Sequence, residues 1–256
     1  MDFQNNLAFT ILVSLNNKYH RSFYQLALLL SGDINLNPGP LQSSNVWDPF
    51  QKRGMHLLHV NINSLLPKVD ELREITILTK ASIIGISESK LDESINDKEI
   101  DIPGYSILRC DRNRHGGVVA CYIKNELCFN RETMLSQEIE HILKNIFVPK
   151  VKPITVGIFY RPPSQNNFIE ILLKQLNSLD TQKNEIYFLG DFNINLLQGN
   201  QYILKENLSN KSKDLITPLI RQYKEFCQMY SLKQLIREPT RVTCDSSSLI
   251  DHIISS

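Results

Sequence analysis

Short apolar runs alternate with helix-like stretches along most of the chain. Continuous apolar runs predict buried strands, because a strand inside a covered sheet is apolar on both faces. Such runs occupy residues 57–60, 82–86, 117–123, 154–159 and 185–189. Apolar residues spaced for one helical face predict helices over 69–78, 168–179 and 215–230. Strands and helices interleaved in this order indicate one α/β domain with strand ends gathered at one edge.

The first 53 residues have a different pattern. Apolar residues spaced for one face predict a helix over 19–30, which Gly32 would end. Asn37-Pro38-Gly39-Pro40 predicts a rigid turn, since proline cannot continue a helix. The segment after it is polar and irregular, which predicts a linker. We therefore expect an N-terminal appendage at 1–40, a linker at 41–53 and the α/β domain at 54–256.

Composition changes this picture little. Of the 256 residues, 42% are hydrophobic and 21% charged, ordinary values for a globular protein with a core. Lys and Arg total 28 against 27 Asp and Glu, which argues against nucleic-acid binding by bulk charge and leaves a locally basic groove open. The five cysteines form no CxxC pair and fit free thiols in a reducing compartment. No apolar run approaches the roughly 20 residues of a membrane span, and the start is a poor secretory signal, so we expect an intracellular protein.

Polar side chains follow the predicted strands. Asn61 follows the first strand, Glu88 the second, Tyr160 the run at 154–159, and Asp191 with Asn193 the run at 185–189. Taken singly, each of these residue types is more often a turn or cap residue. Their recurrence at strand ends, where α/β enzymes place their chemistry, predicts a site. Carboxylate and amide oxygens suit Mg²⁺, with Mn²⁺ as the alternative, and such a site suits a phosphodiester substrate.

Taken in order, these motifs resemble the endonuclease/exonuclease/phosphatase superfamily, most closely the apurinic-type endonuclease domain of LINE-type non-LTR retrotransposons. The motifs that carry the resemblance lie at residues 59–65, 85–88, 112–117, 157–163, 190–193, 239–241 and 249–253. The resemblance covers about residues 54–256. It implies a DNase I-like four-layer sandwich, two mixed sheets flanked by helices, here missing its last strand or strands. It also implies a monomeric nuclease that nicks DNA for reverse transcription and is expected in the nucleus.

The resemblance implies a role for each matched position. Glu88 would be the metal ligand, assisted by Asn61. Asp191 would orient or deprotonate the attacking water. Asn193 and Tyr160 would contact the scissile phosphate, and Asp251 would orient the family's catalytic histidine. The chemistry would be metal-assisted hydrolysis of a phosphodiester bond.

Two departures from the family pattern bear on these expectations. The family's final Ser-Asp-His is not found, because His252 adjoins Asp251 in an earlier motif and every other histidine lies upstream. Residues 32–40 resemble a ribosome-skipping, 2A-like peptide, with Asn35 where glutamate is usual; a helix stop followed by a turn is the other interpretation.

Two alternatives to an active nuclease stay open. One is a remnant that at most binds metal or nucleic acid. The other is a phosphatase of inositol lipids or nucleotides, against which Tyr160-Arg161-Pro162-Pro163 speaks. We expect target preference to come from loops at 126–148 and 198–213.

Overall fold

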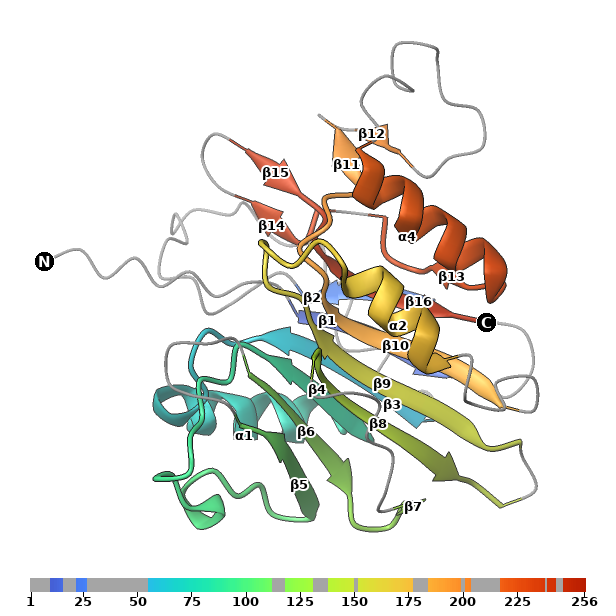
Figure 1. Cartoon of the computed structure of the whole chain (residues 1–256). Helices are drawn as coiled ribbons and strands as arrows, with labels where there is room; N and C mark the ends of the chain where they lie inside the picture. Colours follow the sequence, from blue (N-terminus) through green and yellow to red (C-terminus); the bar gives the residue numbers. More distant parts are fainter. Residues whose placement is uncertain are drawn as a thin grey trace, which may run out of the picture.

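The chain folds into two six-stranded sheets packed face to face, with helices on their outer faces (Figure 1). This computed structural model describes residues 10–15, 22–26, 55–111, 118–130, 138–149, 152–176, 184–198, 201–203, 217–237, 239–242 and 246–256. Both sheets contain parallel and antiparallel pairs, so the expected α/β architecture of two mixed sheets is confirmed.

The first sheet has the strand order β2-β1-β3-β4-β6-β5. Its strands are β1 (Thr10–Leu15), β2 (Ser22–Leu26), β3 (Met55–Asn61), β4 (Ile83–Ser87), β5 (Tyr105–Cys110) and β6 (Val119–Lys124). β3 and β4 run parallel and are joined through η2 (Leu66–Lys68) and helix α1 (Val69–Thr79), while β6 pairs antiparallel with β4 and β5. The ends of β3 and β4 therefore lie side by side at one edge.

The second sheet has the strand order β13-β16-β10-β9-β8-β7. Its strands are β7 (Cys128–Phe129), β8 (Glu140–Phe147), β9 (Ile154–Tyr160), β10 (Glu185–Asp191), β13 (Lys233–Gln234) and β16 (Asp251–Ser255). β9 and β10 run parallel and are joined through helix α2 (Phe168–Leu176), and β16 runs antiparallel to β10. Helix α4 (Pro218–Met229) precedes β13. Two pairs of short strands form small sheets of their own, β11 (Leu197–Gln198) with β12 (Gln201–Tyr202) and β14 (Arg241–Val242) with β15 (Ser247–Ser248).

Successive side chains of β3 and β4 point to opposite faces of the first sheet, so the two strands contribute to two different hydrophobic cores. Leu57 and Ile83 belong to the large core that includes the second sheet, whereas Leu58 and Ile84 pack with Leu72 of α1. Helices α2 and α4 cover the other face of the second sheet (Figure 1). The central strands of each sheet are thus buried on both faces, which explains why they are almost continuously apolar.

The predicted elements from residue 54 onward are confirmed within the described residues, and two other predictions are wrong. Residues 22–26, inside the helix predicted at 19–30, form strand β2, because pairing with β1 supplies backbone partners that periodicity cannot reveal. The loop predicted at 126–148 contains β7 and β8, and β8 pairs with both β7 and β9. Buried polar residues such as Glu140 and His141 interrupt the apolar pattern of β8. The 2A-like segment, the linker and most of the loop at 198–213 lie outside the described residues, so the domain boundaries stay a prediction.

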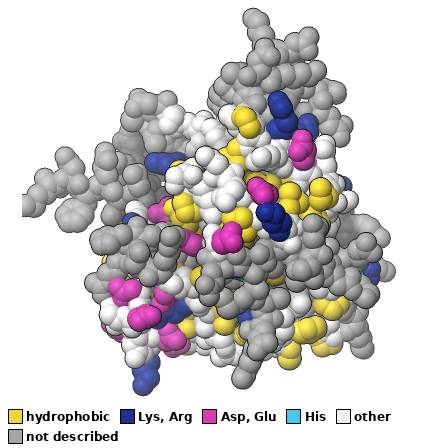
Figure 2. Space-filling model, viewed as in Figure 1, with side chains coloured by type: hydrophobic (Ala, Val, Ile, Leu, Met, Phe, Trp, Pro, Cys, Tyr) yellow, Lys and Arg dark blue, Asp and Glu magenta, His cyan; other side chains and the backbone are white. Residues whose placement is uncertain are grey.

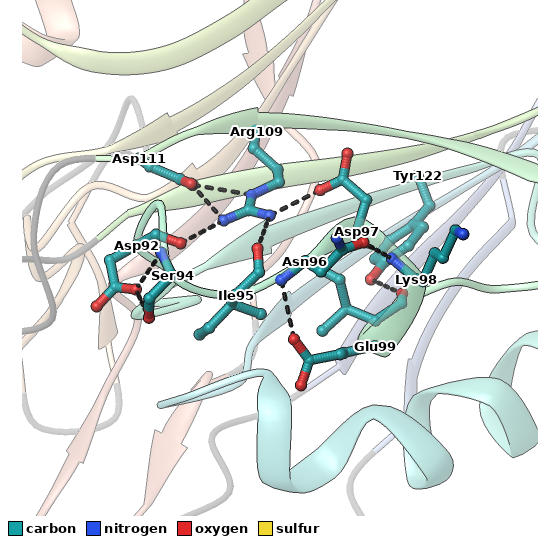
Figure 3. Close-up of polar contacts among 11 residues, drawn as sticks. Asp92, Ser94, Ile95, Asn96, Asp97, Lys98, Glu99, Arg109, Asp111 and Tyr122 are labelled. Atoms are coloured by element: carbon teal, nitrogen blue, oxygen red, sulfur yellow. Dashed lines mark hydrogen bonds and ion pairs between the residues drawn. The ribbon is translucent and has the colours of Figure 1, made fainter.

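The segment that follows β4 has little regular structure and is held by Arg109 on β5 (Figure 3). The Arg109 guanidinium donates to the carbonyl oxygens of Asp92 and Ile95, both at 2.8 Å, and pairs with the carboxylates of Asp97 and Asp111. Such backbone anchoring fixes a loop that has no ladder of its own. The 3-10 helix η3 (Asp97–Glu99) ends the segment.

The surface carries charges of both signs. Acidic and basic side chains are interspersed on the face shown in Figure 2, in line with a net charge of +1. Within the described part of the chain, no helix has the length and apolar character needed to cross a membrane.

The buried His252 side chain predicts a loss of stability in acid. It stacks on Phe192 with ring centroids 5.1 Å apart, and its Nε2 lies 3.0 Å from the Ile194 carbonyl oxygen. Burial lowers the pKa of His252 from 6.5 to about 3. Between pH 6.5 and about pH 3, His252 therefore binds a proton in the unfolded chain but not in the folded chain. The free energy of unfolding consequently falls as pH decreases through this range. We expect this histidine to contribute a loss of about 2–3 kcal/mol between pH 7 and pH 4.5.

Urea unfolding of the wild type and of His252→Gln at the two pH values checks this prediction. His59 and Asp251 are common to both proteins, so the difference between their pH dependences isolates His252. Equal losses of unfolding free energy in the two proteins would contradict it.

Candidate active site

Strand register brings the predicted site residues together. Asn61 lies opposite Ser87, the residue before Glu88, across the parallel pair β3–β4. Tyr160 lies opposite Asp191 across the parallel pair β9–β10, and Asp191 lies opposite Asp251 across β10–β16. The ends of four parallel-paired strands and the start of β16 thus form one edge, as their positions in the sequence predict.

Asn61 joins the two sheets at this edge. Its side-chain Nδ2 donates to Glu88 Oε1 at 3.0 Å and to Asp191 Oδ2 at 2.9 Å. The two acceptors come from β4 and β10, so this one amide holds a carboxylate of each sheet. Because Asn61 and Asp191 are both buried, water competes little for the bond between them. The spacing between the two carboxylates is therefore fixed by the fold.

Glu88 occupies an unusual backbone conformation. Its φ is +53°, in the left-handed region that a residue with a Cβ rarely adopts. The conformation is held by the Glu88 carbonyl, which accepts from Ser64 N at 2.8 Å, and by Ser89 N, which donates to the Val118 carbonyl at 2.9 Å. Conformations of this kind persist where the surroundings enforce them, often at functional sites. Here the result is a partly exposed carboxylate beside Asn61.

The carboxylates of the edge repel one another. Burial, together with the negative charge of Glu88, raises the pKa of Asp191 to about 7 despite hydrogen bonds from Asn193 and Asn61. Burial and the neighbouring Asp191 raise the pKa of Asp251 well above its ordinary value. The nearby Arg241 opposes both shifts. Concentrated acidic charge of this kind attracts a cation, and it keeps Asp191 able to exchange a proton near neutral pH.

The phosphate-contact residues expected from the sequence also lie here. Asn193 has a φ of +47°, its backbone N donates to Asp191 Oδ1 at 2.9 Å, and its Nδ2 donates to the Arg161 carbonyl at 2.9 Å. Tyr160 is buried, and burial together with the carboxylates of Glu88 and Asp191 raises its pKa above the ordinary value. Its hydroxyl is therefore protonated at neutral pH and can donate a hydrogen bond.

The structure places one upstream histidine close to Asp251. His59 lies upstream of Asp251 in the sequence, and its Nδ1 lies 3.9 Å from Asp251 Oδ1. Both side chains are buried, and neither oxygen of Asp251 accepts a hydrogen bond of normal length from the described residues. Burial lowers the pKa of His59 to about 3, so this imidazole is neutral. His59 lies two residues before Asn61 on the same strand, so both side chains are on the same face of the sheet. This spacing is the sequence signal that could have predicted His59 near the site.

Arg161 also had no role assigned from the sequence. It is 1% exposed, and burial lowers its pKa while Asp191 raises it. An arginine between an apolar strand and two prolines is the only signal in the sequence.

The residues of this edge fit a hard divalent cation that keeps part of its water. Among the described residues, no group of three or more His, Cys, Asp or Glu side chains could hold a metal alone. Mg²⁺ is commonly held by one or two carboxylates, completing its shell with water and substrate phosphate. Glu88 and Asn61, joined through Asn61 Nδ2, carry a carboxylate and an amide oxygen between them, and both of these are hard ligands that match that donor set.

Solved structures with this fold include several nucleases. The endonuclease domain of TRAS1, a telomere-specific non-LTR retrotransposon, is 16% identical with a TM-score of 0.57, over 77% of this chain and 82% of that domain. The AP endonuclease LMAP from Leishmania major is 14% identical with a TM-score of 0.58, over 76% and 75%. A variant of the 3′ phosphatase NExo from Neisseria, bound to a product DNA hairpin, is 15% identical with a TM-score of 0.51, over 77% and 84%. The expected DNase I-like fold of the apurinic-type endonucleases is therefore confirmed. No family model matches the sequence, and no curated protein does either.

Proposed function

We propose that this chain is a metal-dependent DNA endonuclease of a retrotransposon, which hydrolyses a phosphodiester bond to nick target DNA for reverse transcription. The observation that carries the proposal is that one group, the Asn61 amide, donates hydrogen bonds to Glu88 of one sheet and to Asp191 of the other. Similarity to the TRAS1 endonuclease domain supports the retrotransposon assignment, and the DNA-bound NExo structure supports DNA as the substrate class. We expect a monomer that acts in the nucleus, where target DNA lies.

Each side chain has a task in this reaction. Glu88, with Asn61, would hold Mg²⁺ or Mn²⁺, which supplies neutralising charge to the phosphate. Asp191 would orient the attacking water and accept its proton, since a base whose pKa lies near the working pH is the most effective. The Asn193 amide and the Tyr160 hydroxyl would contact the phosphate oxygens.

Asp251 and His59 are buried and would support the groups that contact the substrate. Asp251 would hold the orientation of an imidazole, the role that the family resemblance implies for it. His59 is the imidazole within the described residues that lies close to it, and its burial keeps it from touching a substrate.

The second candidate is a protein that binds metal or nucleic acid without nicking. One observation favours it: both histidines near the site in the described structure, His59 and His252, are fully buried and have lowered pKa values. Neither can protonate a leaving oxygen, a task whose loss typically costs ~10²–10⁴-fold in rate.

A nicking assay separates the two candidates. The purified chain is incubated with supercoiled plasmid and Mg²⁺ or EDTA, beside Asp191→Asn, which keeps the shape of the side chain and removes the proton acceptor. We expect Mg²⁺-dependent relaxation that falls ~10²–10⁴-fold in the variant. Relaxation that survives EDTA, or equal rates in the two proteins, would sink the proposal. A folded wild type that binds Mg²⁺ without nicking would support the second candidate.

A further inference from the structure

Arg161 has the largest fully buried side chain in the described part of the chain. It follows β9 directly, and its guanidinium ends among backbone carbonyl groups. Nε donates to the Gln165 oxygen at 2.8 Å, and Nη2 donates to the Pro163 oxygen at 3.2 Å. Nη1 donates to the oxygens of Phe192 and Asn193, both at 3.2 Å. Burying a cation is costly unless its donors are satisfied, and here each of the three guanidinium nitrogens donates to at least one carbonyl group.

These bonds connect two loops of the site. Pro163 and Gln165 belong to the loop after β9, whereas Phe192 and Asn193 belong to the turn after β10. The backbone of Arg161 adds two more links: its N donates to the Asp191 oxygen and its carbonyl accepts from Asn193 Nδ2, each at 2.9 Å. Every residue of the turn 191–193 therefore bonds to Arg161.

The turn needs such support. Asn193 sits at a φ of +47°, and its backbone N reaches back to the Asp191 carboxylate. Phe192 between them is buried against the rings of Phe168 and Tyr223. Packing fixes the middle of the turn, but the two carbonyl groups after Asp191 point to the guanidinium. These carbonyl groups belong to the same turn that carries the Asp191 and Asn193 side chains.

We propose that Arg161 is a positioning residue of this site, whose guanidinium holds the turn 191–193 against the loop after β9 and so aims Asp191 and Asn193. The inference deepens the proposed function and rests on it for its catalytic consequence. Arginine suits the task because its planar fork has five donors that point in different directions. Lysine keeps the charge but has one nitrogen, so it cannot replace the separate bonds that the three guanidinium nitrogens make to the two loops.

The test uses Arg161→Lys and Arg161→Gln, with Arg73→Lys as the matched control. Arg73 also donates Nε and Nη2 to a carbonyl oxygen, that of Asp101, at 2.9 and 2.7 Å, but it lies on α1. Plasmid nicking gives kcat and KM, and amide hydrogen exchange gives the protection of the peptide spanning 191–193.

We expect both Arg161 variants to lose ~10–100-fold in kcat, because small misplacements of reacting groups have effects of this size. KM should stay within about twofold, since the groups held by Arg161 act on the reacting phosphate rather than on the bulk of the DNA. Exchange at 191–193 should become faster while the protection of β10 at 185–189 is retained. Arg73→Lys should match the wild type in kcat and in the exchange of this turn.

Three results would overturn the inference. The first is wild-type kcat and wild-type exchange in both Arg161 variants. The second is loss of protection throughout the domain in both variants, which would make Arg161 a requirement for folding. The third is full activity in Arg161→Lys with loss only in Arg161→Gln, which would assign the effect to charge. If the wild type does not nick, the proposed function fails, and exchange at 191–193 alone decides whether Arg161 holds the turn.

Discussion

Glu88→Ala is expected to remove Mg²⁺ binding outright and to reduce nicking to the level seen in EDTA. Three carboxylates lie at the site edge, but Asp191 and Asp251 are each only 1% exposed. Asp191 also has a pKa of about 7, so protons compete for it at neutral pH. Glu88 is partly exposed, and its carboxylate lies beside the Asn61 amide. Without it, the remaining amide and neutral or buried groups cannot replace a hard anionic ligand.

Calorimetric titration with Mg²⁺ checks this prediction independently of nicking. The wild type is compared with Glu88→Ala and with Glu170→Ala, an exposed glutamate on α2 that pairs with Lys174. We expect at least a ~100-fold loss of affinity in the first variant, since even the partners of metal ligands are worth ~10–100-fold, and no change in the second. Unchanged Mg²⁺ affinity in Glu88→Ala would refute the ligand assignment.

Gly190→Ala is expected to prevent stable folding. A Cβ at Gly190 would lie 2.0 Å from the Phe159 carbonyl oxygen and 2.8 Å from its carbonyl carbon. The obstacle is backbone, because Gly190 and Phe159 are opposite one another in the parallel pair β9–β10. Relief of the overlap requires these central strands to separate beside Asp191 and Tyr160. We expect a loss above ~4 kcal/mol, the range of severe core disruption.

The matched comparison is Gly104→Ala. A Cβ there meets no atom within 4 Å, although the φ of +86° disfavours alanine. Backbone strain alone should therefore cost about 1–3 kcal/mol. Urea unfolding followed by circular dichroism measures both variants. A Gly190→Ala protein that unfolds cooperatively with a stability close to that of Gly104→Ala would contradict the register of β9 and β10.

The amino-acid pattern was sufficient for the elements of the central layers. The runs that form β3, β4, β9 and β10 are continuously apolar because these strands are covered on both faces. A continuous apolar run can be recognised from neighbouring residues alone. Polar residues directly after these runs had to lie at strand ends. The motifs could therefore supply the candidate residues Asn61, Glu88 and Asp191.

Elements that depend on strand pairing could not be predicted in this way. Strand β8 contains the partly exposed Lys144 and Asn145, so it lacks an apolar run; its pairing with β7 and β9 makes it a strand. Residues 22–26 have helical spacing but pair with β1. In both cases hydrogen bonds to the paired strand outweigh the local pattern.

The chemistry of the site depends on distances that no local pattern contains. The Asn61–Asp191 bond joins residues 130 positions apart, and His59 meets Asp251 only because β3 and β16 lie in facing sheets. The raised pKa of Asp191 follows from burial and from the nearby Glu88, and the arginine that holds its turn is recognisable only from the carbonyl groups around it. Residue types and strand ends are local properties of the chain. Charge coupling and hydrogen-bond partners depend on the distances between side chains of different segments. These distances are set only when the two sheets pack together.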